Sequence, residues 1–198
     1  MNKSVRDEYA KKTRADILLN ARYVFTQTAF ASSSLQQIAE AAGVTRGALY
    51  HHFKNKEDIF LAVFRELQSE MVQHLGHQIA QEEQTEPWDL VKTILSEFLE
   101  YSQNPVYRKI VLIEGPVALG WLQWRKVEEE YAFNFIGSLV DTLAAQGTLI
   151  EANRDAVITM IFGLTVESSM ALAKSEDRFS SADIKILMEK MLMSFKVE

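Results

Sequence analysis

The chain has 198 residues, 47% of them hydrophobic and 24% charged, and it carries a net charge of −6. It contains no cysteine, which excludes disulfides, thiolate metal sites and a cysteine nucleophile. The N-terminal residues are charged and unlike a signal peptide, and no run of about 18 apolar residues occurs, so we expect a cytoplasmic protein without a membrane span.

Three prolines and eight glycines are spread over the chain, which favours long helices over a many-stranded sheet. Apolar residues recur at the spacing of three and four that places them on one face of a helix. The sequence therefore predicts an all-α protein of about nine helices. In chain order these helices cover residues 11–29, 35–42, 46–53, 56–80, 87–103, 104–114, 121–146, 154–175 and 181 onward.

The predicted helix ends carry capping residues. Ser34, followed three positions later by Gln37, forms a capping-box pattern, and Gly43 is the residue type preferred just after a helix. Gly115-Pro116 is expected to interrupt the helix that begins after Asn104. The other predicted N-caps are Thr45, Asn55, Asn104, Asn153 and Ser180, and Gly147 marks a further helix end.

Charge is distributed unevenly along the chain. Residues 1–60 carry nine basic and six acidic side chains, a balance of +3, whereas residues 61–198 carry twelve basic and 21 acidic ones, a balance of −9. A positive head on a negative body favours one orientation of approach to DNA. The alternative is that so small a positive balance arises by chance, and charge alone does not favour either interpretation over the other.

Residues 42–45, Ala-Gly-Val-Thr, join the second and third predicted helices in a tight turn. In a helix-turn-helix, the second helix enters the major groove of DNA. Arg46 can read guanine, Gly47 lets the helix approach closely, and Tyr50 adds an aromatic hydroxyl. The alternative is that the turn is an ordinary helix connection and that these side chains are merely solvated.

The longer pattern around this turn is more specific. Its apolar positions include Ile17, Leu18 and Phe25, and the segment 42–57 reads Ala-Gly-Val-Thr-Arg-Gly-Ala-Leu-Tyr-His-His-Phe-Lys-Asn-Lys-Glu. This first third of the chain resembles the DNA-binding domain of the TetR family. The sequence departs from the family where Ala29 precedes Phe30, since a glycine is frequent there, and the local turn geometry is affected.

The resemblance implies a homodimer that binds a palindromic operator and is released by a small-molecule effector. It implies a DNA-binding domain over residues 1–56 and a ligand-binding and dimerisation domain over 57–198. The implied DNA-contacting residues are Ser34, Gln36, Thr45, Arg46, Gly47, Tyr50, His51, His52 and Lys56.

The last two predicted helices are expected to form the dimer interface, because in the family they pair with their symmetry mates. The alternative is that both apolar stripes face only the core of their own chain. The expected interface residues are Ile161, Leu164, Ser168, Leu172, Ile184, Leu187, Met188, Met191, Leu192 and Phe195.

Aromatic residues are frequent between the fifth and eighth helices, and cavities that bind drug-sized ligands are mostly apolar. Each aromatic could equally be plain core. The expected pocket residues are Phe98, Tyr101, Tyr107, Trp121, Trp124, Phe133 and Phe162. Glu97, Glu100, Glu114 and Glu167 could meet a cationic ligand if buried, although a solvated position is the simpler expectation.

No cofactor or metal is expected. Glu70, His74 and His77 have a spacing that could hold zinc, but a polar outer helix face explains them more simply. No phosphate-binding loop or nucleophile–base arrangement indicates an enzyme. A transcriptional activator and a helical adaptor without effector response remain as alternatives to a repressor.

Overall fold

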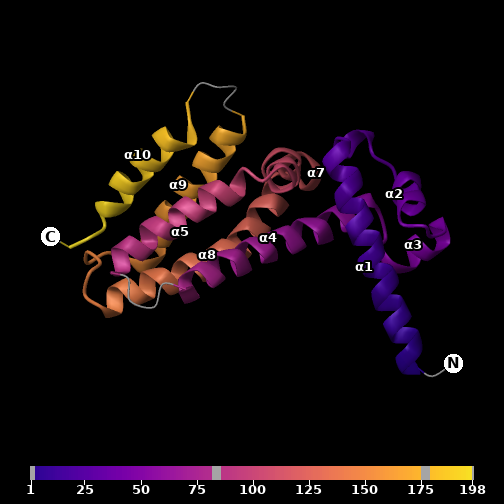
Figure 1. Ribbon diagram of the computed structural model, residues 1–198, viewed down its shortest axis with the longest axis horizontal. Helices are drawn as coiled ribbons and strands as arrows, with labels where there is room; N and C mark the ends of the chain where they lie inside the picture. The colour runs from indigo at the N-terminus through magenta and orange to yellow at the C-terminus, as the bar shows by residue number, and fades with distance from the viewer. Residues whose placement is uncertain (1–2, 82–85, 175–178, 198) are drawn as a thin grey trace.

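The computed structural model describes residues 3–81, 86–174 and 179–197, and the described residues form helices and no sheet. The all-α prediction is therefore confirmed, with nine α-helices of five residues or more in these ranges. Figure 1 shows α1, α2 and α3 gathered at one end, with α4 running from them into a larger helical body. The principal helices are α1 (Lys3–Gln27), α2 (Leu35–Ala41), α3 (Arg46–His52), α4 (Lys56–Gln81), α5 (Pro87–Ser102), α7 (Gly115–Leu119), α8 (Trp121–Ala145), α9 (Arg154–Ala173) and α10 (Ser181–Met193).

The apolar centre of the head formed by α1 to α3 is continuous with the core of the body. Ile17 and Phe25 of α1, Ile38 of α2 and Leu49 of α3 are completely buried. The helix predicted over 11–29 begins earlier and ends earlier, at Lys3 and Gln27. Its first turns project beyond the head (Figure 1) and their described side chains are mostly exposed, so no apolar stripe marks them in the sequence.

The chain leaves α1 through a short 3-10 turn, Phe30–Ser32. Ala29 precedes this turn with φ −56° and ψ 145°, a conformation that any residue adopts. The departure from glycine at this position therefore causes no backbone strain. Phe30 lies against Phe25 and Phe60, with ring centroids 5.9 and 5.1 Å away, which ties the turn to α1 and α4.

The prediction that Gly115-Pro116 interrupts a helix is wrong. The chain runs through α6 (Pro105–Tyr107) and the π-helical segment η2 (Arg108–Glu114) directly into α7, and Gly115 has helical dihedrals. The wider turn of a π-helix accommodates a proline that cannot donate a hydrogen bond. The break comes instead at Gly120, whose φ of 72° favours glycine.

The body is built around α8 and α9, which pack along each other, with α4, α5 and η2 against them. A second apolar cluster joins α10 to α5 and α9, and consists of Leu95, Leu99, Leu172, Met188 and Leu192. Among the described helices, α9 is long and apolar enough to cross a membrane by length and composition, with 44% of that window buried. A core helix passes the same test, so this is weak evidence for a span.

Candidate nucleic-acid interface and internal cavity

The position of α3 is fixed by caps on either side of the turn. Ser34 Oγ accepts a hydrogen bond from the amide of Gln37, whose side chain in turn accepts one from the Ser34 amide, so the predicted capping box is confirmed. Gly43 has a φ of 64°, and Thr45 Oγ1 accepts from the amide of Ala48 at 3.1 Å. These local bonds set the angle at which α3 leaves the turn.

The outward face of α3 is open and cationic. Arg46 and Tyr50 lie one turn apart on it, with the guanidinium 5.9 Å from the ring centroid and Arg46 Nη2 3.5 Å from the Tyr50 hydroxyl. Gly47 and His51 are also exposed, and a Cβ at Gly47 would meet only the Thr45 hydroxyl, at 3.9 Å. The face therefore offers donors and aromatic edges with no bulky side chain at its centre.

His52 is partly buried, unlike the exposed His51 beside it. Its ring lies 5.3 Å from that of His51, and burial, the charge of His51 and the charge of Arg14 lower its pKa. Arg14 also lies over the ring of Phe53, 5.2 Å from its centroid. Arg14 therefore places a positive charge beside His52.

Of the other predicted DNA-contacting residues, Ser34 and Gln36 are exposed at the start of α2. Gln36 donates to Glu40 at 2.5 Å. Lys56 differs from the expectation of a free cation, because its ammonium donates to the carbonyl oxygens of Phe30 at 2.6 Å and Ser33 at 2.7 Å. In this structure Lys56 thus holds the α1–α2 connection against the start of α4.

An internal cavity of about 100 Å³ lies in the body. Three of the seven expected pocket residues line it, namely Phe98, Tyr107 and Phe162. Its remaining walls come from α4, α5, α8, α9 and α10, including Gln68, Met71, Trp88, Val91, Glu128, Tyr131, Phe135, Thr165 and Leu192.

The other four expected pocket residues are not among those that line this cavity. Trp121 is 57% exposed, and Trp124 is buried with its indole donating to the carbonyl oxygen of Val111 at 3.2 Å. Both belong to the first turn of α8, beside α7. Tyr101 packs on Tyr107 and Phe133 packs on Phe162, so these two lie behind cavity residues.

The polar part of the cavity wall was missed in the sequence analysis. Glu128 is 6% exposed and accepts a short hydrogen bond from Gln68 Nε2, while the hydroxyl of Tyr107 donates to Gln68 Oε1 at 3.3 Å. Burial raises the pKa of Glu128 to about 8, against the smaller opposing effects of Gln68 and Arg125. Glu128 begins a run of three glutamates, which in the sequence is indistinguishable from a solvated face.

The expected interface residues divide into two groups. Ser168, Leu172, Met188 and Leu192 are buried within this chain, whereas Leu187 and Met191 are 57% and 52% exposed. Ile161, Leu164, Ile184 and Phe195 are partly exposed. Two exposed apolar residues were not predicted, Met160 on α9 at 61% and Ile186 on α10 at 53%.

The Glu70, His74 and His77 group does not converge on one point. Glu70 accepts a hydrogen bond from Arg22 at 2.6 Å, and His74 lies 3.1 Å from Glu97. Within the described residues, no group of three or more His, Asp and Glu side chains could hold a metal ion. Glu114 differs from the expectation of a solvated side chain, because it is 8% exposed and pairs with Lys109 at 2.9 Å.

Comparison with known proteins agrees with this architecture. One family model, described as bacterial regulatory proteins of the tetR family, matches residues 17–63, and another, described as the tetracyclin repressor-like C-terminal domain, matches residues 88–195. The chain is 25% identical over 162 residues to the Transposon Tn10 TetC protein of Escherichia coli, a match that covers 82% of this chain and 81% of that protein.

Two further relatives are similar. The chain is 36% identical over 103 residues to the HTH-type transcriptional regulator AcrR of Shigella flexneri, which covers 52% of this chain and 47% of that regulator. The crystal structure of a TetR-family transcriptional regulator from Pectobacterium atrosepticum is 27% identical and superposes with a TM-score of 0.84, covering 100% of this chain and 99% of that one. With a family model matched over more than half of its length, the chain belongs to the TetR family of transcriptional regulators.

Proposed function

We propose that this regulator is a repressor that binds a palindromic operator as a homodimer through α3 and is released when a small molecule enters the cavity of the body. The observation that carries the proposal is the continuity of α4. Phe60, near its start, packs on Phe25 and Phe30 of the head, and Gln68, Met71 and Leu75, further along, line the cavity. A ligand that displaces α4 in the body therefore also acts on the helix that supports the head.

The size of the cavity supports an effector that shifts the conformation. Pockets that hold drug-sized ligands measure roughly 300–1,000 Å³. The cavity, at about 100 Å³, must widen to admit such a ligand. Effector binding then favours a conformer with displaced helices. The coupling free energy between effector and operator is set by the difference in effector binding free energy between that conformer and the DNA-bound one.

The proposed dimer places α9 and α10 of two chains together. The exposed apolar side chains Met160, Ile186, Leu187 and Met191 support this, because a monomer would leave them in water. Gly163, at the outer side of α9, has open space where a Cβ would stand, which permits close approach of a second helix. The proposed dimer interface therefore includes fewer of the ten residues expected from sequence, because four of them are buried within their own chain.

The domain division proposed from sequence, 1–56 and 57–198, falls at the first residue of α4. Because α4 belongs to the cores of both parts, the two are coupled rather than joined by a free linker.

Selection of bound fragments from random duplex DNA tests the proposed function. Wild-type protein should recover one palindrome, and Tyr50→Ala should not, because Tyr50 is 47% exposed on α3 and its loss removes a surface group without opening the core. The matched control is Tyr23→Ala, which removes a tyrosine 64% exposed on α1 and should leave selection unchanged. Recovery of no specific sequence by the wild type would contradict operator binding and favour the adaptor alternative.

A further inference from the structure

The cavity wall is apolar over most of its area and contains few polar side chains. Among the described residues that line it, the polar groups are the side chains of Gln68, Glu128 and Thr165, the hydroxyls of Tyr107 and Tyr131, and the indole N–H of Trp88, which donates to the carbonyl oxygen of Thr148. Glutamate is the one acidic type and no lysine, arginine or histidine contributes to the wall. A ligand carboxylate or phosphate would therefore meet the Glu128 carboxyl group with no cationic side chain in the wall itself, so the wall disfavours anions. The nearest fixed positive charge is that of Arg125, which acts on Glu128 and lies over the ring of Phe162, 4.2 Å from its centroid.

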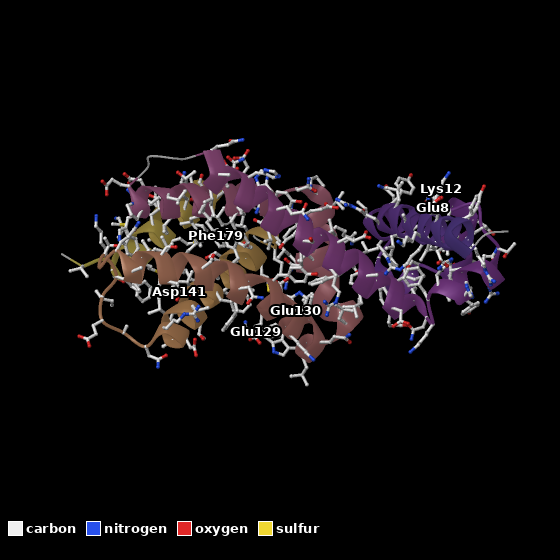
Figure 2. All side chains as sticks on the ribbon, turned by 90° about the horizontal axis from the view of Figure 1, so that it is seen from below. Glu8, Lys12, Glu129, Glu130, Asp141 and Phe179 are labelled. Carbon is white, nitrogen blue, oxygen red and sulfur yellow. The ribbon has the colours of Figure 1, made fainter. Side chains whose placement is uncertain are left out.

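Glu128 is held inward by its neighbours. It lies on α8 opposite Gln68 of α4, and Gln68 is in turn oriented by the hydroxyl of Tyr107 at 3.3 Å. Glu129 and Glu130, the next residues of α8, pair instead with Arg125 and Arg65 on the outer side. Figure 2 labels these two glutamates, whose side chains are 43% and 47% exposed.

We infer that the cavity takes a lipophilic organic cation, whose positive charge lies against the Glu128 carboxylate and whose apolar part lies among the aromatic side chains of α5, α8 and α9. The inference rests on the proposed effector role of the cavity and adds the chemical class of the effector. Phe98, Tyr131, Phe135 and Phe162 line the same space. Aromatic faces attract cations, and the attraction is strongest when the site excludes water.

Binding of such a cation displaces a proton. Burial raises the pKa of Glu128 to about 8, so its carboxyl group is mostly neutral at pH 7. When a permanent cation enters, the carboxyl group ionises against it and one proton leaves to solvent. The affinity of the cation should therefore rise with pH up to about 8 and level off above it.

The groups that face Glu128 do not supply a competing titration in this range. Gln68 on α4 and Thr165 on α9 are not ionisable, and burial raises the pKa of Tyr107 well above that of a free tyrosine. Arg125, one turn earlier on α8, contributes a fixed positive charge; it pairs with Glu129, and its guanidinium lies 4.2 Å from the ring centroid of Phe162. The nearby Tyr101 on α5 adds to the rise in the pKa of Tyr107, and burial raises the pKa of Tyr101 as well.

Two probes of matched shape test the inference by calorimetry with the full chain. Benzyltrimethylammonium carries a permanent charge, and neopentylbenzene is its neutral isostere. At high pH, wild-type protein should bind the cation about tenfold more tightly than neopentylbenzene, or better. Below about pH 8, this ratio of the two affinities should fall by about tenfold per pH unit. Phenylacetate, an anion, should bind more weakly than either.

The decisive variant is Glu128→Gln, which keeps the size of the side chain and a hydrogen-bonding partner for Gln68. It should lose the preference for the cation and its pH dependence while still binding neopentylbenzene. Glu100→Gln, the same change at an exposed position on α5, is the matched control and should behave as wild type. Equal, pH-independent affinity of the wild type for both probes, or an unchanged cation preference in Glu128→Gln, would overturn the inference.

Operator binding is measured separately with the palindrome recovered by selection. Operator binding without cation preference refutes the ligand class and leaves the repressor proposal intact. Cation binding without any recovered operator supports the ligand class and refutes the proposed DNA-binding function.

Discussion

The backbone amide of Phe30, in the head, donates a hydrogen bond to Oε2 of Glu114, in the body, at 3.0 Å. Glu114 is the last residue of η2, and its other oxygen pairs with Lys109 at 2.9 Å. Lys56 of α4 contacts the same head residue, with its ammonium 4.3 Å from the Phe30 ring centroid. Phe30 is thus a point where η2, α4 and the helix-turn-helix meet.

Loss of Glu114 should therefore weaken the connection between head and body. Glu114→Ala removes the acceptor of the Phe30 amide and the partner of Lys109, and it should lower the free energy of unfolding by about 1–3 kcal/mol in urea titration. Glu114→Gln keeps a carbonyl oxygen for the Phe30 amide and should lose less. An equal loss in both variants would show that the charge, rather than the hydrogen bond to Phe30, stabilises the connection.

If Arg46 reads a guanine as proposed, Arg46→Ala should weaken binding to the selected operator by about 1–3 kcal/mol relative to unrelated DNA, because the variant cannot make that bidentate contact. Fluorescence anisotropy with labelled duplexes measures both affinities. Lys126→Ala, at an exposed position on α8, serves as control and should leave both unchanged. Equal losses on operator and unrelated DNA would assign Arg46 to phosphate contact only.

Lys56→Ala should destabilise the head itself, because the carbonyl oxygens of Phe30 and Ser33 lose their charged donor. We expect the free energy of unfolding to fall by about 1–3 kcal/mol. Lys54→Ala, which removes an exposed lysine two residues earlier, should not change stability. A Lys56→Ala variant as stable as wild type, but with a reduced salt dependence of DNA binding, would instead support a direct phosphate contact.

Glu128 should make stability fall as pH rises. Its folded pKa of about 8 lies above the ordinary 4.5, so the folded chain holds a proton that the unfolded chain has released. Between these two values the free energy of unfolding should decrease by about 1.4 kcal/mol per pH unit. Glu128→Gln should remove this slope, as seen by denaturation at several pH values against the Glu100→Gln control, and an unchanged slope would place the titration elsewhere.

Leu187→Glu should convert the proposed dimer into monomers, measured by light scattering after size exclusion. Leu187 is 57% exposed on α10, and a charge buried at the centre of an apolar interface costs about 2 kcal/mol or more. Leu122→Glu introduces the same charge at a leucine 85% exposed at the start of α8 and should remain dimeric. The opposite pattern would move the interface to the α7–α8 end of the body.

Local sequence signals were sufficient for most helix ends and for the helix-turn-helix. Ser34, Thr45, Asn104, Asn153 and Ser180 all accept hydrogen bonds from the amides of the helices they precede, as their positions predict. Caps are recognised from sequence because the side chain and the amide it serves are two or three residues apart. The first turns of α1 escaped prediction because they pack against little.

The tertiary structure decided which side chains face inward where the local pattern allows several. Among Glu128, Glu129 and Glu130 the sequence offers three equal carboxylates, and only the packing of α4 against α8 buries the first beside Gln68. The same holds for α10, where Met188 is buried and Leu187 is exposed. By itself the sequence determined the all-α class, the turn and the family; the cavity, its acid and the Phe30–Glu114 contact depend on residues 39 or more positions apart, which only the folded chain brings together.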